Sequence, residues 1–517
     1  MLNTSRSRRG MVTAPHRLAS QAGLQVLREG GNAIEAAVAT AAALAVVYPH
    51  MNSIGGDGFW LIAEPGQAPV AIDASGRAAA GASLALYRDH GLASVPWRGP
   101  LAANTVAGTL SGWDAALAIS RRWGGRLPLA RVLADAIAYA EDGVLATEGM
   151  AELVAAKWDE LSALPSASVC GLFGAAPPRP GDVIRQPALA ATLRRLAEDF
   201  AADLAGLGSP VAHRDLTSHT ASVVAPLSVR IGGADLFNLP PPTQGLASLM
   251  ILALFDRLGV TEGEGFAHIH GLVEATKQAF LVRDRHVGDP AHMEVDAQSL
   301  LDDAAGLDAR AARIDPRRAL PWPQPPSAGD TVWFGAIDGE GRAVSTIQST
   351  YFEFGSGLLL PRTGVIWQNR GASFRIAEDG WNALKPGRKP FHTLNPAMAR
   401  FDDGRTMVYG TMGGEGQPQT QAAVFTRYAM YGEGLQAAVT APRWLLGRTW
   451  GEESTSLKLE DRFDPALVAA LRAAGHDAEL LASFTSTMGH AGALVRHPDG
   501  TLEGAADPRS DGAVAAW

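Results

Sequence analysis

Residues 33–47 constrain the fold most, because this stretch has helical length but almost no polar face. Asn32 precedes it and can cap a helix, and Glu35 follows three residues later, which is the pattern of a capping box. A helix that is apolar all round is buried on most of its surface. The strand-like runs 59–63 and 70–73 are apolar on both faces and need cover on both sides. These patterns favour an α+β fold with helix–sheet–sheet–helix layers.

Bulk composition excludes several classes of function. The chain has 517 residues and a formal net charge of −9, with no concentrated basic tract, so nucleic acid is not an expected partner. Its single cysteine, Cys170, excludes an internal disulfide and a cysteine-based metal site. The basic N-terminus lacks the apolar core of a secretory signal, and the apolar run 36–48 is too short for a bilayer. We therefore expect a cytoplasmic protein without membrane contact.

Hydrophobic periodicity, capping residues and glycines predict the order of the elements. No low-complexity linker separates two autonomous domains. The expected strands, besides the two above, are 221–224, 227–231, a hairpin that starts at 331, and a last hairpin that includes 492–496; the expected helices are 20–29, 33–47, 111–123, 129–142, 150–161, 188–204, 246–258, 266–286, 420–440 and 464–474.

Thr331 has a setting that allows catalysis. It follows a proline-rich, unpatterned tether over 321–329 and begins a buried strand. A threonine is an ordinary strand residue, and its hydroxyl is a weak nucleophile without a base. Cleavage between Asp330 and Thr331 would supply that base, because a free α-amine has a pKa of about 7.7–8.0. Thr331 could then act as nucleophile and base together.

A nucleophile of this kind also needs donors for an oxyanion. The run 411–416 contains Gly413 and Gly414, and glycines let backbone N–H groups point into a site. A structural turn is the other interpretation of this run. The 13 histidines show no metal-ligand spacing, and neither a metal nor a cofactor is expected.

These features in this order resemble the γ-glutamyltranspeptidase family of N-terminal-nucleophile hydrolases. The resemblance covers nearly the whole chain, in segments 19–23, 30–33, 49–58, 240–242, 284–290 and 507–512, with Arg77 and the glycines 413–414. It implies a four-layer αββα sandwich and self-cleavage into a large subunit, 1–330, and a small subunit, 331–517, that form one domain. It also implies that Thr331 is the nucleophile, that Gly413 and Gly414 hold the oxyanion, and that Arg77 binds the substrate's carboxylate.

Departures from the family pattern bear on the substrate. The family's second threonine and the asparagine two residues later correspond to Ser349 and Tyr351. Its Asn-Gln-x-Asp-Asp stretch corresponds to 369–373. This chain lacks the acid that would pair with an α-ammonium and has Ser373 in this stretch, and an arginine, Arg370, is new.

The family's Ser-Ser pair lies where this chain has Phe391-His392, followed by Thr393. We include His392 and Thr393 among the expected substrate-binding residues. An additional cation and a missing acid favour a small acid amide without an ammonium group.

The run 48–52, with Asp57 among the glycines, and the run 347–349 are similar to the oxamate amidohydrolase branch of the family, which acts in purine catabolism. The resemblance implies that oxamate gives oxalate and ammonia through a threonyl acyl-enzyme. A γ-glutamyl hydrolase or transferase acting on glutathione-like substrates, and a β-lactam side-chain acylase, are alternatives within the family. A non-enzyme alternative is an unprocessed protein that binds an acid. A dimer of the two-subunit unit is also possible.

Overall fold

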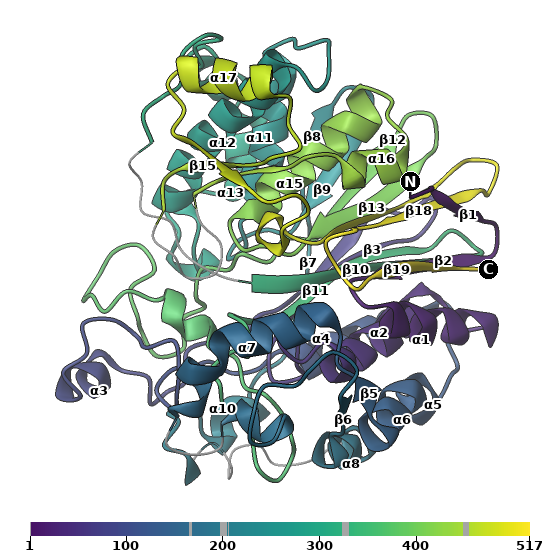
Figure 1. The fold of residues 1–517 in the computed structure, drawn as a ribbon, viewed down its shortest axis with the longest axis vertical. Helices are drawn as coiled ribbons and strands as arrows, with labels where there is room; N and C mark the ends of the chain where they lie inside the picture. Colours follow the sequence, from purple (N-terminus) through teal and green to yellow (C-terminus); the bar gives the residue numbers. More distant parts are fainter. Residues whose placement is uncertain (1, 165–167, 197–203, 205, 323–329, 448–453) are drawn as a thin grey trace.

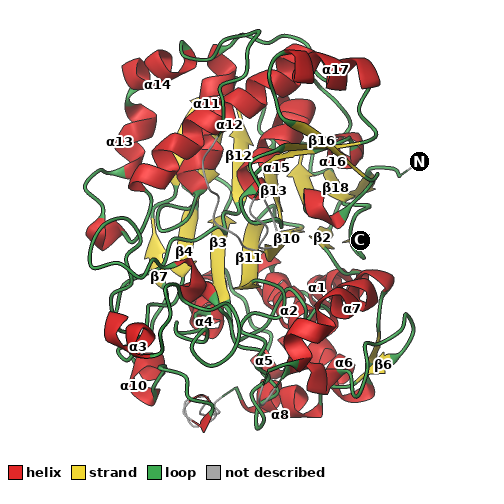
Figure 2. Cartoon of the chain, turned by 60° about the vertical axis from the view of Figure 1, so that its left-hand side comes forward, coloured by secondary structure: helices red, strands yellow, loops and turns green. Residues whose placement is uncertain are grey.

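A computed structural model describes residues 2–164, 168–196, 204, 206–322, 330–447 and 454–517. Two seven-stranded sheets lie face to face between two layers of helices (Figure 1). Figure 2 shows the same layers from the side, with helices above and below the strands. The predicted α+β fold with αββα layers is confirmed.

Both sheets combine strands from either side of residue 330. The upper sheet in Figure 1 has the order β1 (Ser5–Ser7), β18 (Leu502–Ala506), β17 (Ala491–Arg496), β13 (Thr406–Thr411), β12 (Ala397–Phe401), β9 (Ala234–Asn238) and β8 (Leu227–Ile231). The lower sheet has the order β19 (Ala513–Ala516), β2 (Gly10–Ala14), β10 (Asp330–Asp338), β11 (Ala343–Tyr351), β3 (Asp57–Ala63), β4 (Val70–Ala74) and β7 (Ser222–Val224). Two small sheets pair β14 (Trp444–Leu446) and β16 (Ala478–Leu481) with β15 (Leu457–Glu460), and β5 (Val144–Leu145) with β6 (Val183–Ile184).

Each sheet has its own helical layer. Below the lower sheet lie α1 (Arg17–Arg28), α2 (Ala33–Val47), α3 (Leu84–Asp89), α4 (Thr109–Arg122), α5 (Leu129–Val132), α6 (Ala134–Asp142), α7 (Glu148–Ser162), α8 (Pro187–Arg195) and α10 (His213–Thr217). Above the upper sheet lie α11 (Gly245–Arg257), α12 (Phe266–His286), α13 (Ala297–Asp302), α14 (Ala304–Ala311), α15 (Gly416–Phe425), α16 (Leu435–Thr440) and α17 (Pro465–Ala473). No helix within the described residues combines the length and apolarity that a membrane crossing requires.

Three large apolar cores among the described residues hold the layers together. One lies between the lower helices and the lower sheet, and α2 is buried along its entire length there. A second lies between the upper sheet and α11, α12 and α15. The third fills the space between the sheets, where Phe59 and Trp333 of the lower sheet meet Met398 and Val408 of the upper one. Because both faces of each sheet are covered, the strands are apolar on both sides, as the sequence predicts.

The local predictions hold where short-range signals are strong. The Asn32 side chain accepts from the Glu35 N–H at 3.1 Å, and the Glu35 carboxylate accepts from the Asn32 N–H at 2.9 Å, so the capping box is confirmed. The helix predicted over 266–286 has the same bounds as α12.

Three predicted helices differ from the structure. The helix expected over 129–142 is broken at Leu133, between α5 and α6. Of the helix expected over 188–204, α8 ends at Arg195, where Leu196 takes a left-handed φ of 45°, and residues 197–203 lie outside the described residues. The helix expected over 420–440 is interrupted after a π-turn by Gly432, whose φ is 71°. The part of the predicted tether at 323–329 lies outside the described residues.

Candidate active site

Thr331 lies at the head of β10, in the middle of the lower sheet, and is fully buried. The strand pairs Asp330 with Tyr351 and Val332 with Gln348, so two residues of β11 face the single Thr331. This is a β-bulge, a feature that often re-aims a side chain beside an active site. Ser349 is one of the two facing residues, and its hydroxyl accepts a hydrogen bond from the Tyr351 N–H at 2.9 Å.

The predicted oxyanion glycines form a turn after β13. Gly413 and Gly414 have φ values of 118° and 51°, and side chains are strained in this region. The turn ends as α15 begins, where the Gly416 N–H donates to the Gly413 carbonyl at 2.7 Å. Glycine is therefore required here by backbone geometry, and the N–H groups of the turn have no Cβ beside them.

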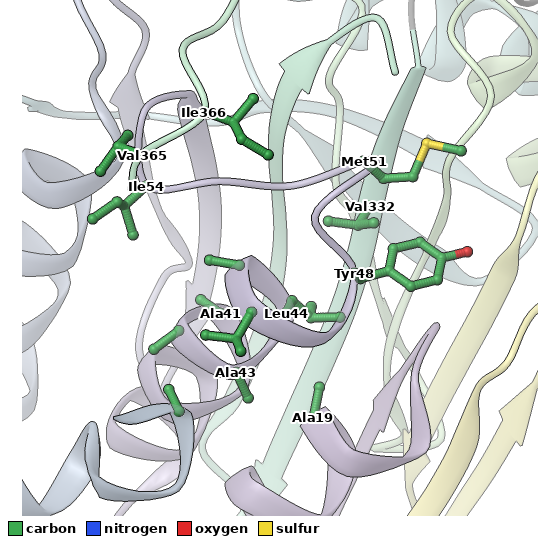
Figure 3. Packing of buried hydrophobic residues seen from close by; sticks show 14 of the residues in the cluster. Ala19, Ala41, Ala43, Leu44, Tyr48, Met51, Ile54, Val332, Val365 and Ile366 are labelled. Carbon is green, nitrogen blue, oxygen red and sulfur yellow. The ribbon is translucent and has the colours of Figure 1, made fainter. Parts of the chain in front are cut away.

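The glycine turn is connected to the head of β10 through a buried group of side chains. The Met412 N–H donates to the His490 carbonyl at 3.2 Å, and the His490 ring hydrogen-bonds the Tyr48 hydroxyl at 3.2 Å. Figure 3 shows Tyr48 and Met51 beside Val332, the residue after Thr331. Met412 belongs to the same apolar core as Val332. A Cβ on Gly410 of β13 would lie 2.2 Å from the Trp333 ring, so the end of β13 that leads into the turn packs on the first residues of β10.

Gln244 connects the glycine turn to a second part of the site. Its Nε2 donates to the Gly414 carbonyl at 2.8 Å and to the Thr393 carbonyl at 2.7 Å. Arg283 fixes the orientation of this amide by donating to Gln244 Oε1 at 3.0 Å. The sequence did not identify Gln244, because nothing local distinguishes a glutamine that joins two distant backbone carbonyls.

Arg370 is held in the interior by two contacts. Its guanidinium lies 3.6 Å from the centre of the Tyr351 ring, and its Nη1 donates to Thr393 Oγ1 at 3.3 Å. Only 1% of the residue is exposed. Burial lowers the pKa of Arg370 to about 10, opposed by Tyr351 and Asp57, so the side chain remains cationic at neutral pH. The resemblance-based prediction for Arg370 thus falls on a buried cation that is linked to the glycine turn through Thr393 and Gln244.

Tyr351 has an unusual backbone conformation, with a φ of 86°. A bulky residue in this region is strained, whereas asparagine tolerates it well. The resemblance implies asparagine at this place, a residue that adopts a positive φ with less strain than tyrosine. The Tyr351 ring lies on Arg370, at a position that the sequence associates with substrate binding.

Asp57 is a buried acid between Arg370 and His392. Its Oδ1 accepts from the Gly76 N–H at 2.9 Å and from Gln368 Nε2 at 3.1 Å, and its Oδ2 lies 3.1 Å from His392 Nε2. Burial raises the pKa of Asp57 to about 7, against the lowering effect of these donors and of Arg370.

Burial, with Arg370 and Lys389 nearby, lowers the pKa of His392 well below its usual value, so the imidazole is neutral. The sequence placed Asp57 in a glycine motif without assigning it to the site. The signal was an acid within a run of glycines that precedes a buried strand.

Two other predicted residues, Arg77 and Ser373, contact protein groups away from Arg370. The Arg77 side chain is 50% exposed, lies 3.5 Å from the Asp289 carboxylate, and donates to the Gly387 carbonyl at 3.0 Å. It borders a cavity of about 650 Å³. The Ser373 hydroxyl donates to the Phe391 carbonyl at 3.3 Å. Arg77 therefore points outward, although the backbone beside it donates to Asp57 through Gly76.

One group among the described residues has the composition of a metal site. His270, Glu274 and His476 lie close together and are buried. His270 Nδ1 and His476 Nε2 hydrogen-bond each other at 2.9 Å, and Glu274 accepts from Lys277 Nζ at 2.7 Å. Each side chain already has a protein partner, and this group lies outside the site described above, so no metal enters the chemistry considered below.

The chain is similar to known proteins over nearly its whole length. The γ-glutamyltranspeptidase family profile matches residues 19–517. The oxamate amidohydrolase proenzyme of Klebsiella pneumoniae subsp. pneumoniae is 55% identical, over 100% of both chains. The glutathione hydrolase-like YwrD proenzyme of Bacillus subtilis is 39% identical, over 98% of each. The crystal structure of cephalosporin acylase from Bacillus halodurans superposes with a TM-score of 0.90 at 32% identity, over 100% of this chain and 97% of that one.

Proposed function

The chain belongs to the γ-glutamyltranspeptidase family and is a hydrolase, and on that premise we propose that it cleaves itself between Asp330 and Thr331 and then hydrolyses oxamate. The observation that carries the proposal is the buried Thr331 at the head of β10, beside the Ser349 bulge and near the Gly413–Gly414 turn. The 55% identity to an oxamate amidohydrolase proenzyme supports the choice of substrate.

Self-cleavage precedes the reaction on oxamate. The Thr331 hydroxyl adds to the Asp330 carbonyl carbon, and its proton passes to the Thr331 nitrogen as the peptide C–N bond breaks. Water then hydrolyses the resulting ester to the Asp330 carboxylic acid and the free Thr331 hydroxyl. The product is a new α-amine on Thr331, beside its own hydroxyl. Because both sheets share strands from residues 1–330 and 331–517, the two subunits remain joined by strand pairing after cleavage.

The same hydroxyl then attacks the oxamate amide. Its proton passes to the Thr331 amine, whose ordinary pKa of about 7.7–8.0 suits a base near neutrality. The N–H groups of Gly413 and Gly414 stabilise the oxyanion of the tetrahedral intermediate. The amine returns the proton to the leaving nitrogen, the C–N bond breaks, and ammonia departs. Water then attacks the acyl-enzyme and releases oxalate.

Ser349 steadies the nucleophile in this scheme, in place of the family's second threonine. Its hydroxyl sits opposite Thr331 in the bulge and is oriented by the Tyr351 N–H. We include a cytoplasmic location, a role in purine catabolism and pairing of two cleaved units in the proposal, each as a separate expectation.

A γ-glutamyl or acylase activity is the second candidate, favoured by one observation. Arg77 is retained and borders a cavity of about 650 Å³ that also contains Asp73 and Asp289. Such a mixture of charges suits a larger substrate with an ammonium and a carboxylate.

Ammonia release from oxamate, compared with release of aniline from a γ-glutamyl anilide, tests the proposal. We expect the purified, cleaved protein to release ammonia and to leave the anilide intact, and Thr331→Ala to abolish the activity. Anilide release without ammonia release would instead select the γ-glutamyl candidate.

A further inference from the structure

One edge of the Arg370 guanidinium has N–H donors without a hydrogen-bond partner among the described residues. Within the described part of the chain, its Nε and Nη2 are buried and have no hydrogen-bond partner, while Nη1 is bound to Thr393. Buried N–H donors without a partner are costly, and native proteins rarely leave them unpaired. Nε and Nη2 lie side by side on the guanidinium, and their two N–H groups form a fork that matches the two oxygens of a carboxylate.

We propose that Arg370, rather than Arg77, anchors the substrate carboxylate, and that it does so through the Nε–Nη2 fork. The inference rests on the proposed function and deepens it, because it names the part of the site that selects an acid amide.

The guanidinium is fixed before any ligand arrives. The Tyr351 ring covers one face of it at 3.6 Å, and Thr393 holds the opposite end from the fork. A preorganised fork loses little freedom when a carboxylate binds, so more of the interaction remains as affinity. Tyr351 has a left-handed backbone here, with a φ of 86°.

The anchor lies close to the reacting bond. Tyr351, on which the guanidinium rests, is the strand partner of Asp330, the residue before Thr331. On the other side, Thr393 is joined to Gly414 through Gln244, at 2.7 and 2.8 Å. A substrate held between the fork and the glycine turn therefore has its carboxylate near its reacting carbonyl. Oxamate, in which the two groups are directly bonded, has this arrangement.

The charges around the fork also select against an ammonium group. Arg370 is cationic and His392 is neutral, and Asp57 is the nearby acid, with its Oδ1 already accepting from Gly76 and Gln368. Ser373, where the family has an acid, donates its hydroxyl to a backbone carbonyl. An ammonium placed beside Arg370 would meet a like charge without a dedicated acid, so a γ-glutamyl group is disfavoured.

Arg77 is the rival anchor, and the two arginines are compared directly. It is an arginine of the same site region, but its side chain is half exposed and already contacts Asp289 and Gly387. Removing a solvated arginine that has partners of its own should affect a carboxylate inside the protein little.

The test uses three variants of the cleaved enzyme: Arg370→Met, Arg370→Lys and Arg77→Met. Self-cleavage on a denaturing gel reports folding of each. Ammonia release is measured from oxamate and from ethyl oxamate, which has no carboxylate, and oxalate binding is measured by calorimetry.

We expect Arg370→Met to lower kcat/KM for oxamate at least about 100-fold, the range seen when one partner of a buried charge pair is removed, and to change kcat/KM for ethyl oxamate less than about threefold. Arg370→Lys keeps the charge but not the fork, and should raise the KM for oxamate about tenfold. Arg77→Met tests the rival anchor, and its loss of kcat/KM for oxamate should be at least about tenfold smaller than that of Arg370→Met.

Several outcomes would overturn the inference. Arg370→Met could retain oxamate turnover, or it could lose both amides equally, which a structural role would produce; alternatively, Arg77→Met could abolish oxalate binding. If Arg370→Met does not cleave itself, Arg370→Lys takes its place, and an unchanged KM for oxamate in Arg370→Lys would overturn the inference.

The same experiment distinguishes failure of the proposed function from failure of the Arg370 anchor. If the wild type releases no ammonia from oxamate but binds oxalate through Arg370, the anchor stands and the assigned substrate falls. If the wild type binds no oxalate, the anchor itself is refuted.

Discussion

Gly489 gives the sharpest test of the glycine turn, because it touches the turn without being one of its members. Gly489 lies just before β17 and has a φ of 78°. A Cβ at this position would lie 2.4 Å from the Met412 carbonyl oxygen. Such a contact is far inside van der Waals distance, so Gly489→Ala must displace the backbone that leads into Gly413 and Gly414.

The size of the effect follows from the role proposed for the turn. An oxyanion donor contributes about 2.7–4 kcal/mol to transition-state stabilisation, which corresponds to about 10²–10³ in kcat. A displacement of about 1 Å in a positioned group costs a comparable factor of about 10². We therefore expect Gly489→Ala to lower kcat for oxamate about 100-fold, with a smaller effect on KM, because the carboxylate anchor lies elsewhere.

Gly500 is the matched control for this variant. It follows the other end of β17 and has a φ of 83°, and a Cβ at this position would have no neighbouring atom within 4 Å. Alanine at either glycine brings a similar backbone strain of about 1 kcal/mol, so the difference between the two variants isolates the displacement of the turn. Steady-state ammonia release and circular dichroism melting are measured for both. A Gly489→Ala enzyme with the kcat of Gly500→Ala would refute the assignment of the oxyanion donors.

Three further predictions concern the residues around Thr331. Asp57→Asn should flatten the pH dependence of the melting temperature. Burial raises the pKa of Asp57 in the folded protein to about 7. The stabilisation that the protonated Asp57 gives to the folded state is therefore fully present below about pH 4 and is lost as the pH rises through 7. A wild type and variant that fall in parallel between about pH 5 and 8 would contradict this. Ser349→Ala should slow self-cleavage and lower kcat about tenfold, because the Tyr351 N–H loses its acceptor, whereas Ser349→Thr should restore both in a gel time course; no slowing in Ser349→Ala would count against the bulge. Tyr351→Leu keeps the backbone strain but removes the ring from Arg370, and should raise the KM for oxamate about 3- to 30-fold; an unchanged KM would show that the ring does not hold the anchor.

Short-range chemistry determines the parts of the fold that could be predicted from the sequence. The Asn32–Glu35 capping box and the glycine that follows α12 are local signals, and both lead to elements with the expected bounds. Thr331 at the start of a strand was also readable, because a proline-rich stretch precedes an apolar run. Its burial between a bulge and a glycine turn was not, because that depends on which strands pair.

The contacts that complete the site join residues far apart in the chain. Gly489 packs against the Met412 carbonyl, and Gln244 links Gly414 to Thr393 by hydrogen bonds. Neither Gly489 nor Gln244 stands in a local motif. The unpaired fork of Arg370 likewise exists only once Tyr351 and Thr393 are placed. Sequence patterns could indicate that an arginine had been gained and an acid lost, but they could not show which edge of that arginine is open.

N-terminal sequencing of the purified protein, together with a denaturing gel over time, tests the proposed self-cleavage most directly. We predict two fragments, residues 1–330 and 331–517, the second beginning Thr-Val-Trp, with ammonia release from oxamate rising in step with cleavage. Thr331→Ala should remain a single chain without activity. A wild-type chain that stays intact and still releases ammonia at the full rate would contradict the proposed mechanism, because Thr331 would then have no free amine.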